Sequence, residues 1–324
     1  MEKMPTTTHT LNNASSASFF AEPQAPNVKF GEVPFSTLLD SLTDLNNKNK
    51  QHLANVSSCC GSFRNATLVE SVFLMCEELR LDPLVGYQAL EILDRFMVKH
   101  LKNLFGSQSV EDAAEGDNRS REDAVLTMLS DKFILLMFSC VQLASKLTHH
   151  LSALDNNRAV AFLKSVGHSC SKGTLLESEL LVLKTLDFSI NFPNPLMYVE
   201  TLLEVLEYNA AVAPVTHLYA LSQRVLQFIF LQRTAIYNSL LVAATACQSP
   251  SLEQRVNFVC VREDYMLLSV GVIAAAAFVL NLSTWEKVVQ ELSDVTGISP
   301  QSISDFVRVT VLHIARTEGA FKTA

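Results

Sequence analysis

Apolar residues recur every three or four positions along most of the chain, which is the spacing of one face of an α-helix. The run Leu68, Val72, Met75 and Leu79 is a clear example, with acidic residues between its members. No segment shows the alternation of apolar and polar residues that is typical of a half-buried strand. The pattern predicts an all-α protein.

Capping residues and prolines divide this pattern into helices. We expect a first helix from about residue 33 that ends in the polar run 46–49. Five further helices are predicted to begin near Ala66, at Pro83 with Asp82 as N-cap, near Ala124, after Asp155 and after Lys172-Gly173. The segment 106–123 carries six carboxylates and is predicted to be an acidic, mobile loop.

A second set of helices is predicted after residue 193. Asn194-Pro195 offers an N-cap followed by proline at the first helical position. More helices are expected from Pro214, through residue 246, over 265–282, from a capping-box pattern at 283–286 and from Ser299-Pro300. The predicted organisation is a disordered tail (1–28), a domain with a preceding helix (29–193) and a second helical domain (194–318).

Composition narrows the class of protein. The chain has 324 residues, 48% hydrophobic and 18% charged, which is enough apolar material for two helical domains. The net charge of −8 argues against nucleic acid as a direct partner. The seven cysteines are odd in number and show no CxxC spacing, so we expect reduced core thiols and no metal or cofactor.

Nothing in the sequence predicts a membrane protein or an enzyme. The N-terminal residues are too polar for a signal peptide, and the apolar stretch 265–282 is interpreted as a buried core helix, so a soluble intracellular protein is expected. Phosphate-binding loops, nucleophile elbows and metalloprotease motifs are absent from the sequence. We therefore expect no catalytic residues.

Two charges interrupt strongly apolar helical runs. Lys146 follows the apolar stretch 133–144, and Glu179 lies among leucines. An unpaired charge in such a setting is costly, so a Lys and a Glu from two helices could satisfy each other. This spacing alone leaves two interpretations open, a structural ion pair between helices and a contact for a partner protein.

These two positions, with Leu93-Asp94-Arg95-Phe96 and Leu143-Ala144-Ser145-Lys146, resemble the cyclin box, the kinase-binding module of cyclins. The resemblance covers about residues 64–192 and is weaker over the second half. It implies a cyclin-like fold of two tandem bundles and a contact with a cyclin-dependent kinase. The implied kinase-binding residues are Leu143, Lys146, Leu147, Glu179 and Phe188.

The resemblance also marks departures from the family pattern. Asp94 matches a carboxylate that pairs with an Arg in the first cyclin-box helix, but that position reads Asn65, with Arg64 one residue earlier. The family's docking patch for Arg-x-Leu motifs has a Met and a Trp where this chain has Arg64 and Ser71, and only Leu68 matches. The resemblance therefore predicts a degenerate docking patch.

The functional expectation is a regulatory subunit that holds a kinase in its active conformation. The runs 68–96 and 177–206 resemble a meiotic member of the cyclin family, which implies a nuclear role on meiotic chromosomes, in crossover maturation and with crossover proteins as partners. The alternative is a cyclin-fold scaffold that activates no kinase and recruits recombination or ubiquitin-pathway proteins.

Overall fold

The computed structural model describes residues 29–56, 59–106, 115–148, 154–209, 215–280 and 284–322, with side chains described outside 106–130 and 318–322. Within these ranges the secondary structure consists of helices without strands, so the predicted all-α class is confirmed. The tail 1–28 and residues 107–114 of the acidic loop lie outside the described residues.

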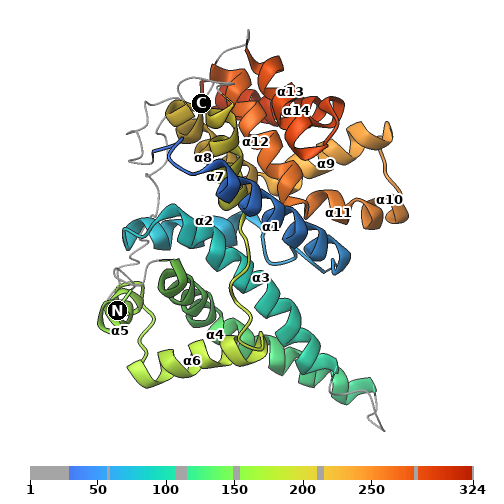
Figure 1. Ribbon diagram of the computed structural model, residues 1–324. Coiled ribbons are helices and arrows are strands. Elements are labelled where there is room, and N and C mark those ends of the chain that lie inside the picture. The colour runs from blue at the N-terminus through green and yellow to red at the C-terminus, as the bar shows by residue number, and fades with distance from the viewer. Residues whose placement is uncertain are drawn as a thin grey trace.

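The first group of helices contains α2 (Ala66–Glu78), α3 (Pro83–Gly106), α4 (Glu115–Thr148), α5 (Asn156–Ser165) and α6 (Lys172–Thr185). It forms the lower half of Figure 1, where α3 and α4 pack along each other and α6 crosses below them. Local capping sets the helix starts as predicted. Asp82 accepts a hydrogen bond from the Leu84 N–H at 2.8 Å, and Asp155 accepts one from the Asn157 N–H at 2.6 Å.

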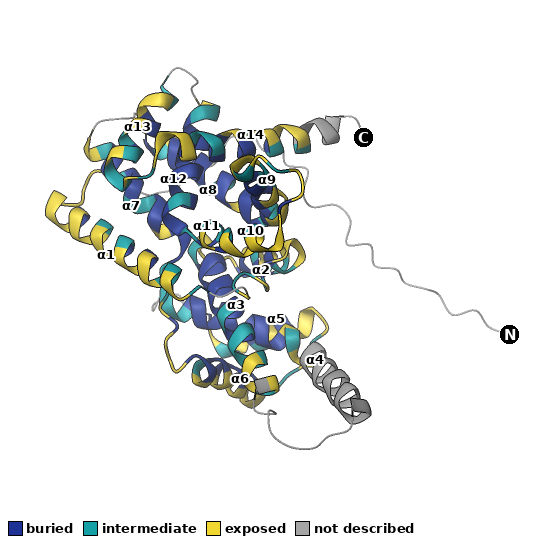
Figure 2. Ribbon diagram, turned by 90° about the vertical axis from the view of Figure 1, so that its right-hand side faces the viewer, coloured by how far each residue is buried: buried dark blue, intermediate teal, exposed yellow. Residues whose placement is uncertain are grey.

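The second group surrounds one apolar helix, α12 (Tyr265–Leu280). Around it pack α7 (Pro195–Tyr208), α8 (Val215–Leu231), α13 (Trp285–Thr296) and α14 (Pro300–Lys322), and α9 (Arg233–Thr245) lies against α14. Figure 2 shows α12 as an almost continuously buried helix. Ser269 hides its hydroxyl by donating to the Pro195 carbonyl at 3.1 Å. The stretch 265–282 was predicted to be a buried core helix, and its described part, 265–280, is one.

Helix α1 (Phe35–Ala54) runs through the polar stretch 46–49 that the sequence pattern predicted as its end. The reason is Asn49, which is only 4% exposed. Its side chain donates to Asp264 at 2.9 Å and accepts from the Tyr265 N–H at 3.1 Å. A fully bonded amide removes the cost of burying this residue, so α1 continues and packs on α7 and α12.

The predicted loop over the acidic segment is corrected. The acidic segment is helical from Glu115, because α4 begins there and not near residue 124. The connection after residue 249 contains two short helices, α10 (Leu252–Asn257) and α11 (Val259–Arg262), the first opened by a capping box at Ser251. Helix α13 has no side-chain cap from Thr284, and residue 283 of the predicted capping box lies outside the described residues.

A buried ion cluster joins the two groups of helices. Arg64, which precedes α2, lies 2.8 Å from Glu91 and 3.5 Å from Asp94, both on α3. Its other terminal nitrogen is 3.7 Å from Glu263, which ends α11. Glu263 also lies 2.9 Å from Arg233 at the start of α9. The pairing of Asp94 with a neighbouring Arg, in doubt from the sequence, is thus made by Arg64.

No single helix in the described ranges is long and apolar enough to span a membrane. Two bent pairs, α8 with α9 at 88° and residues 252–262 with α12 at 73°, reach that length and composition only when taken together. The cysteines are free. Cys76 and Cys140 are buried in the core as expected, whereas Cys59 and Cys260 are exposed.

Candidate functional site

Lys146 and Glu179 meet at the end of α4. The Lys146 ammonium donates to both carboxylate oxygens of Glu179, at 2.5 and 2.8 Å. The side chain of Glu179 is 6% exposed, whereas that of Lys146 is 38% exposed. An ammonium has three N–H donors and two are used here, so one remains for an acceptor outside the chain.

Contacts between α4 and α6 hold this ion pair in place. Lys146 lies in the last turn of α4, where a cation is favoured by the exposed carbonyls of the helix end. About two helical turns before Lys146, the Ser139 hydroxyl donates to the Ser178 hydroxyl at 2.8 Å, which holds α4 against α6. Ala144, two residues before Lys146, is fully buried in the core. The pair is therefore presented on rigid elements.

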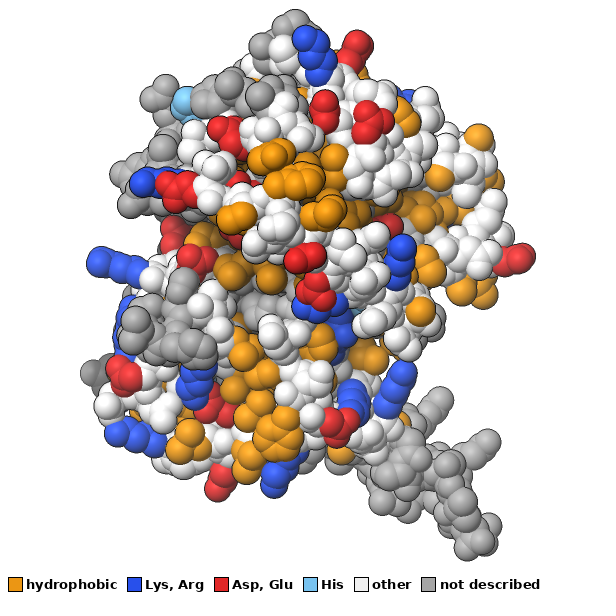
Figure 3. Space-filling view, viewed as in Figure 1, with side chains coloured by type: hydrophobic (Ala, Val, Ile, Leu, Met, Phe, Trp, Pro, Cys, Tyr) orange, Lys and Arg blue, Asp and Glu red, His pale blue; other side chains and the backbone are white. Residues whose placement is uncertain are grey.

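Leucines surround the pair on the outer face of α6. Leu176 and Leu180 are 46% and 42% exposed, and they flank Glu179 along the helix. Leu147 and Leu183 are half-buried against the core. In Figure 3 apolar side chains gather over the lower part of the molecule, where α6 lies. The ion pair is thus bordered by exposed leucines, an apolar surface that a partner protein could cover.

Phe188 completes this face in an unusual backbone conformation. The Phe188 N–H donates to the Leu183 carbonyl at 2.8 Å and the Asp187 N–H to the Lys184 carbonyl at 3.2 Å, which is the Schellman pattern of a helix C-terminus. Both Asp187 and Phe188 have positive φ, 51° and 59°, where Gly or Asn is usual. The Phe188 ring is 63% exposed. An aromatic held outward at this backbone cost is a candidate contact residue.

Three of the five predicted kinase-binding residues, Lys146, Leu147 and Phe188, reach the surface, and Glu179, which is 4% exposed, does so only through its bonds to Lys146. Leu143 does not, because its side chain is 5% exposed and lies in the core. Leu143 therefore packs inside the fold on α4, and its contact with a kinase stays a prediction. Leu176 and Leu180 were not predicted from the sequence as part of this face. Their signal was present, since a helix with leucines on all sides must bury more than one face.

The predicted docking patch is also corrected. Arg64 is 3% exposed and belongs to the ion cluster, so it places no charge in a surface groove. Leu68 is half-buried. Ser71 returns its hydroxyl to the Thr67 carbonyl at 2.8 Å within α2. The remaining surface of α2 offers a Ser hydroxyl, already bonded, where the family has a Trp ring.

Comparison with known proteins identifies the family. The chain is 41% identical over 285 residues to mouse "Cyclin N-terminal domain-containing protein 1", a match that covers 88% of this chain and 85% of the relative. The human protein of the same name is 42% identical over 285 residues, covering 88% and 86%. This chain belongs to that cyclin family. A scan against protein-family models found no match.

Membership in this family agrees with the arrangement of the helices. The all-α architecture is a cyclin-like fold, and the chain is a cyclin-like protein. The Asp94 carboxylate, which accepts from the Gly61 and Phe63 N–H groups at 2.8 and 2.9 Å, stabilises the turn before α2. The Arg64–Asp94 contact at 3.5 Å and these two bonds hold that turn against α3.

Proposed function

We propose that this cyclin-like chain is the regulatory subunit of a cyclin-dependent kinase and binds it through the Lys146/Glu179 face. The observation that carries the proposal is the unequal exposure of the ion pair. Glu179 is nearly enclosed while Lys146 is open to solvent and has a spare donor. A pair that served only to staple two helices would need neither the spare donor nor the exposed leucines beside it.

The surface chemistry fits a mobile helix of a kinase. Exposed Leu176, Leu180 and Phe188 would bury apolar area against such a helix, while Lys146 would bind backbone carbonyls at its end. If the chain binds the kinase helix only in its active position, binding favours the active conformation of the kinase. In that conformation the catalytic Lys–Glu pair and the metal site of the kinase assemble. The chain would act as a regulatory protein and carry out no catalysis itself.

The proposed setting is crossover maturation in meiotic recombination, in the nucleus and on meiotic chromosomes. This part of the proposal rests on the resemblance of residues 68–96 and 177–206 to a meiotic cyclin. It predicts that the chain associates with meiotic crossover proteins as well as with a kinase. Immunostaining of spread meiotic chromosomes checks it, and a diffuse cytoplasmic signal throughout prophase would contradict it.

A second candidate function is a cyclin-fold scaffold that activates no kinase. Its support is the altered α2 surface, where Ser71 replaces an aromatic anchor and Arg64 is turned inward. Such a chain would recruit recombination or ubiquitin-pathway proteins through other surfaces. The scaffold reading predicts that changes at Lys146 leave its partners unchanged.

Affinity capture from meiotic tissue separates the two candidates. Wild-type chain should co-purify a cyclin-dependent kinase, and Lys146→Glu should lose it because the reversed charge repels the backbone carbonyls that the Lys would bind. A matched control is Lys48→Glu, since Lys48 also pairs with a carboxylate, at 2.6 Å, and its side chain is 46% exposed on α1. Capture of the same kinase by wild type and Lys146→Glu would favour the scaffold.

A further inference from the structure

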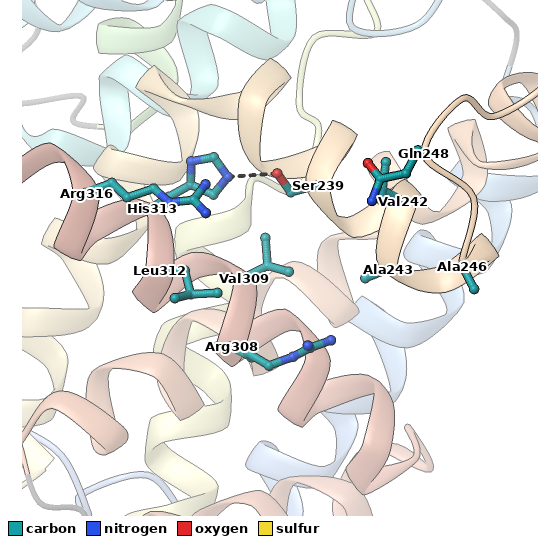
Figure 4. Close-up of a pocket in the computed structure, with 10 residues that line it drawn as sticks. All are labelled: Ser239, Val242, Ala243, Ala246, Gln248, Arg308, Val309, Leu312, His313 and Arg316. Atoms are coloured by element: carbon teal, nitrogen blue, oxygen red, sulfur yellow. Dashed lines mark hydrogen bonds between the residues drawn. The ribbon is translucent and has the colours of Figure 1, made fainter.

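A pocket of about 430 Å³ lies between α9 and α14, far from the Lys146/Glu179 face in the fold. Helix α14 contributes Arg308, Leu312, His313 and Arg316, and α9 contributes Ser239 and Ala243 (Figure 4). The His313 ring bonds to the Ser239 hydroxyl at 2.9 Å, which fixes the floor between the two helices. The pocket therefore has rigid walls from two packed elements.

The charge of this pocket is opposite to that of the molecule. The chain carries a net charge of −8, yet the residues that line the pocket include two arginines and no carboxylate. Arg308 pairs with Asp305 at 3.1 Å, but both side chains are solvent-exposed, and such pairs hold an arginine only weakly. Arg316 is exposed and makes no ion pair with a described residue. Both guanidinium groups are available to an anionic ligand.

The spacing along α14 specifies the shape of that ligand. Arg308, Leu312 and Arg316 are four residues apart, so the two arginines are separated by about 12 Å along the helix axis, with Leu312 midway. Leu312 is 49% exposed. In an extended chain, residues two apart lie on the same side at about 6.6 Å, so three such residues match this row of side chains.

The size of the pocket suits a short segment of chain. Its volume of about 430 Å³, along a row of side chains about 12 Å long, has room for a few extended residues. An extended backbone is also free to bond to the polar side chains along the pocket.

We propose that the pocket between α9 and α14 binds an extended acidic segment of a partner protein, with the pattern acidic–x–apolar–x–acidic. Its two carboxylates pair with Arg308 and Arg316, and its apolar side chain packs on Leu312 and Ala243. Arginine and carboxylate form charge-assisted, bidentate bonds, which fix the register of the peptide. Nucleic acid fits less well, because apolar residues separate the arginines and the net charge repels a polyanion.

A fluorescein-labelled peptide centred on Glu-x-Leu-x-Glu tests the ligand. It should bind the full chain, and a Gln-x-Leu-x-Gln or a Glu-x-Ser-x-Glu version should bind at least about tenfold more weakly. Binding should weaken with added salt. Equal binding of all three peptides would overturn the proposal. So would binding of a single-stranded DNA oligonucleotide that is as tight as that of the acidic peptide.

Charge-matched variants test the site. Arg308→Gln with Arg316→Gln should lose at least about tenfold in peptide affinity, whereas Lys102→Gln with Lys287→Gln, both exposed and outside the pocket, should bind as wild type. Both double variants should melt as wild type does. Unchanged affinity in the arginine variant, or equal losses in the two, would overturn the assignment. Kinase capture should be unaffected by the arginine changes, so this test is independent of the kinase proposal.

Discussion

Glu263 has no exposed surface and forms ion pairs with arginines from three segments, Arg64, Arg233 and Arg262. Burial alone would raise the pKa of its carboxyl, but Arg233, Arg64 and Arg262 outweigh burial and lower that pKa to about 2. The pKa of Glu263 is therefore lower in the folded chain than in the unfolded chain. By linkage, the ionised carboxylate stabilises the fold by ~3 kcal/mol above about pH 5, and this is lost as the pH falls through about 2.

The change Glu263→Gln tests this cluster. At neutral pH it should lower the free energy of unfolding by about 3–5 kcal/mol, because it leaves the buried guanidinium group of Arg233 without its carboxylate partner and removes one of the three carboxylates near Arg64. The deficit should shrink between about pH 5 and pH 2, where wild type loses the same charge. Urea unfolding followed by circular dichroism at several pH values measures it. A deficit that does not change with pH would contradict the assigned ionisation.

Phe188 is expected to serve binding at the expense of stability. Phe188→Asn keeps the positive φ at lower cost, so the free energy of unfolding should stay unchanged or rise by up to about 1 kcal/mol. Kinase association should weaken, because the exposed ring is lost from the face. Urea unfolding and kinase capture on one preparation measure both. A loss of stability above about 1 kcal/mol would show that Phe188 supports the fold instead.

At the scale of elements, the close approach of α12 and α14 depends on Gly271. A Cβ at this position would lie 2.3 Å from a ring carbon of the fully buried Phe306. Gly271→Ala should therefore lower stability by about 1–3 kcal/mol or more, although Ala is the better helix former. Gly173→Ala in α6 is the control, since its Cβ would meet only the Ser171 hydroxyl at 3.5 Å. Thermal unfolding should separate the two, and equal melting temperatures would contradict this packing.

The surface of α2 predicts weak substrate docking. Ser71 buries far less apolar area than the Trp of the family pattern, and its hydroxyl is already bonded within the helix. Arg-x-Leu peptides should show no micromolar binding to the full chain by fluorescence anisotropy. Micromolar binding that is lost in Leu68→Ala would demonstrate a working groove on α2.

Helix starts were predictable because their causes are local. Asp82, Asp155 and Asn194 each cap the helix that follows within three residues, and the sequence contains all the partners. The extension of α1 was not predictable, because Asn49 is satisfied by residues more than two hundred positions away. Long-range partners of a polar residue carry no signal in its neighbours.

The candidate site was predictable to the same extent. The Lys146/Glu179 pair follows from two charges that need each other in apolar surroundings, and it forms. The burial of Leu143 depends on how α4 is rotated about its axis, and that of Arg64 depends on the turn before α2. Helical periodicity in the sequence does not fix the rotation of a helix to within one residue. A prediction can therefore mistake a buried residue for its exposed neighbour.

At the scale of the molecule, the two groups of helices are joined where α2 packs on α8 and α3 on α7, and by the ion cluster around Glu263. This leaves two separate surfaces with different chemistry. The face around Lys146 and α6 carries exposed leucines beside the ion pair, and the pocket between α9 and α14 is lined by two arginines and no carboxylate. A regulatory subunit could bind a kinase at the first and a second protein at the other.

The most direct test of the kinase-binding claim is the charge exchange Lys146→Glu with Glu179→Lys, measured for both stability and kinase capture. The exchange keeps an ion pair between α4 and α6, so it should recover most of the stability that Glu179→Lys alone loses. It cannot restore a lysine donor at position 146, so kinase capture should remain lost. Recovery of kinase capture together with stability would contradict the account and show that the pair serves only to join the helices.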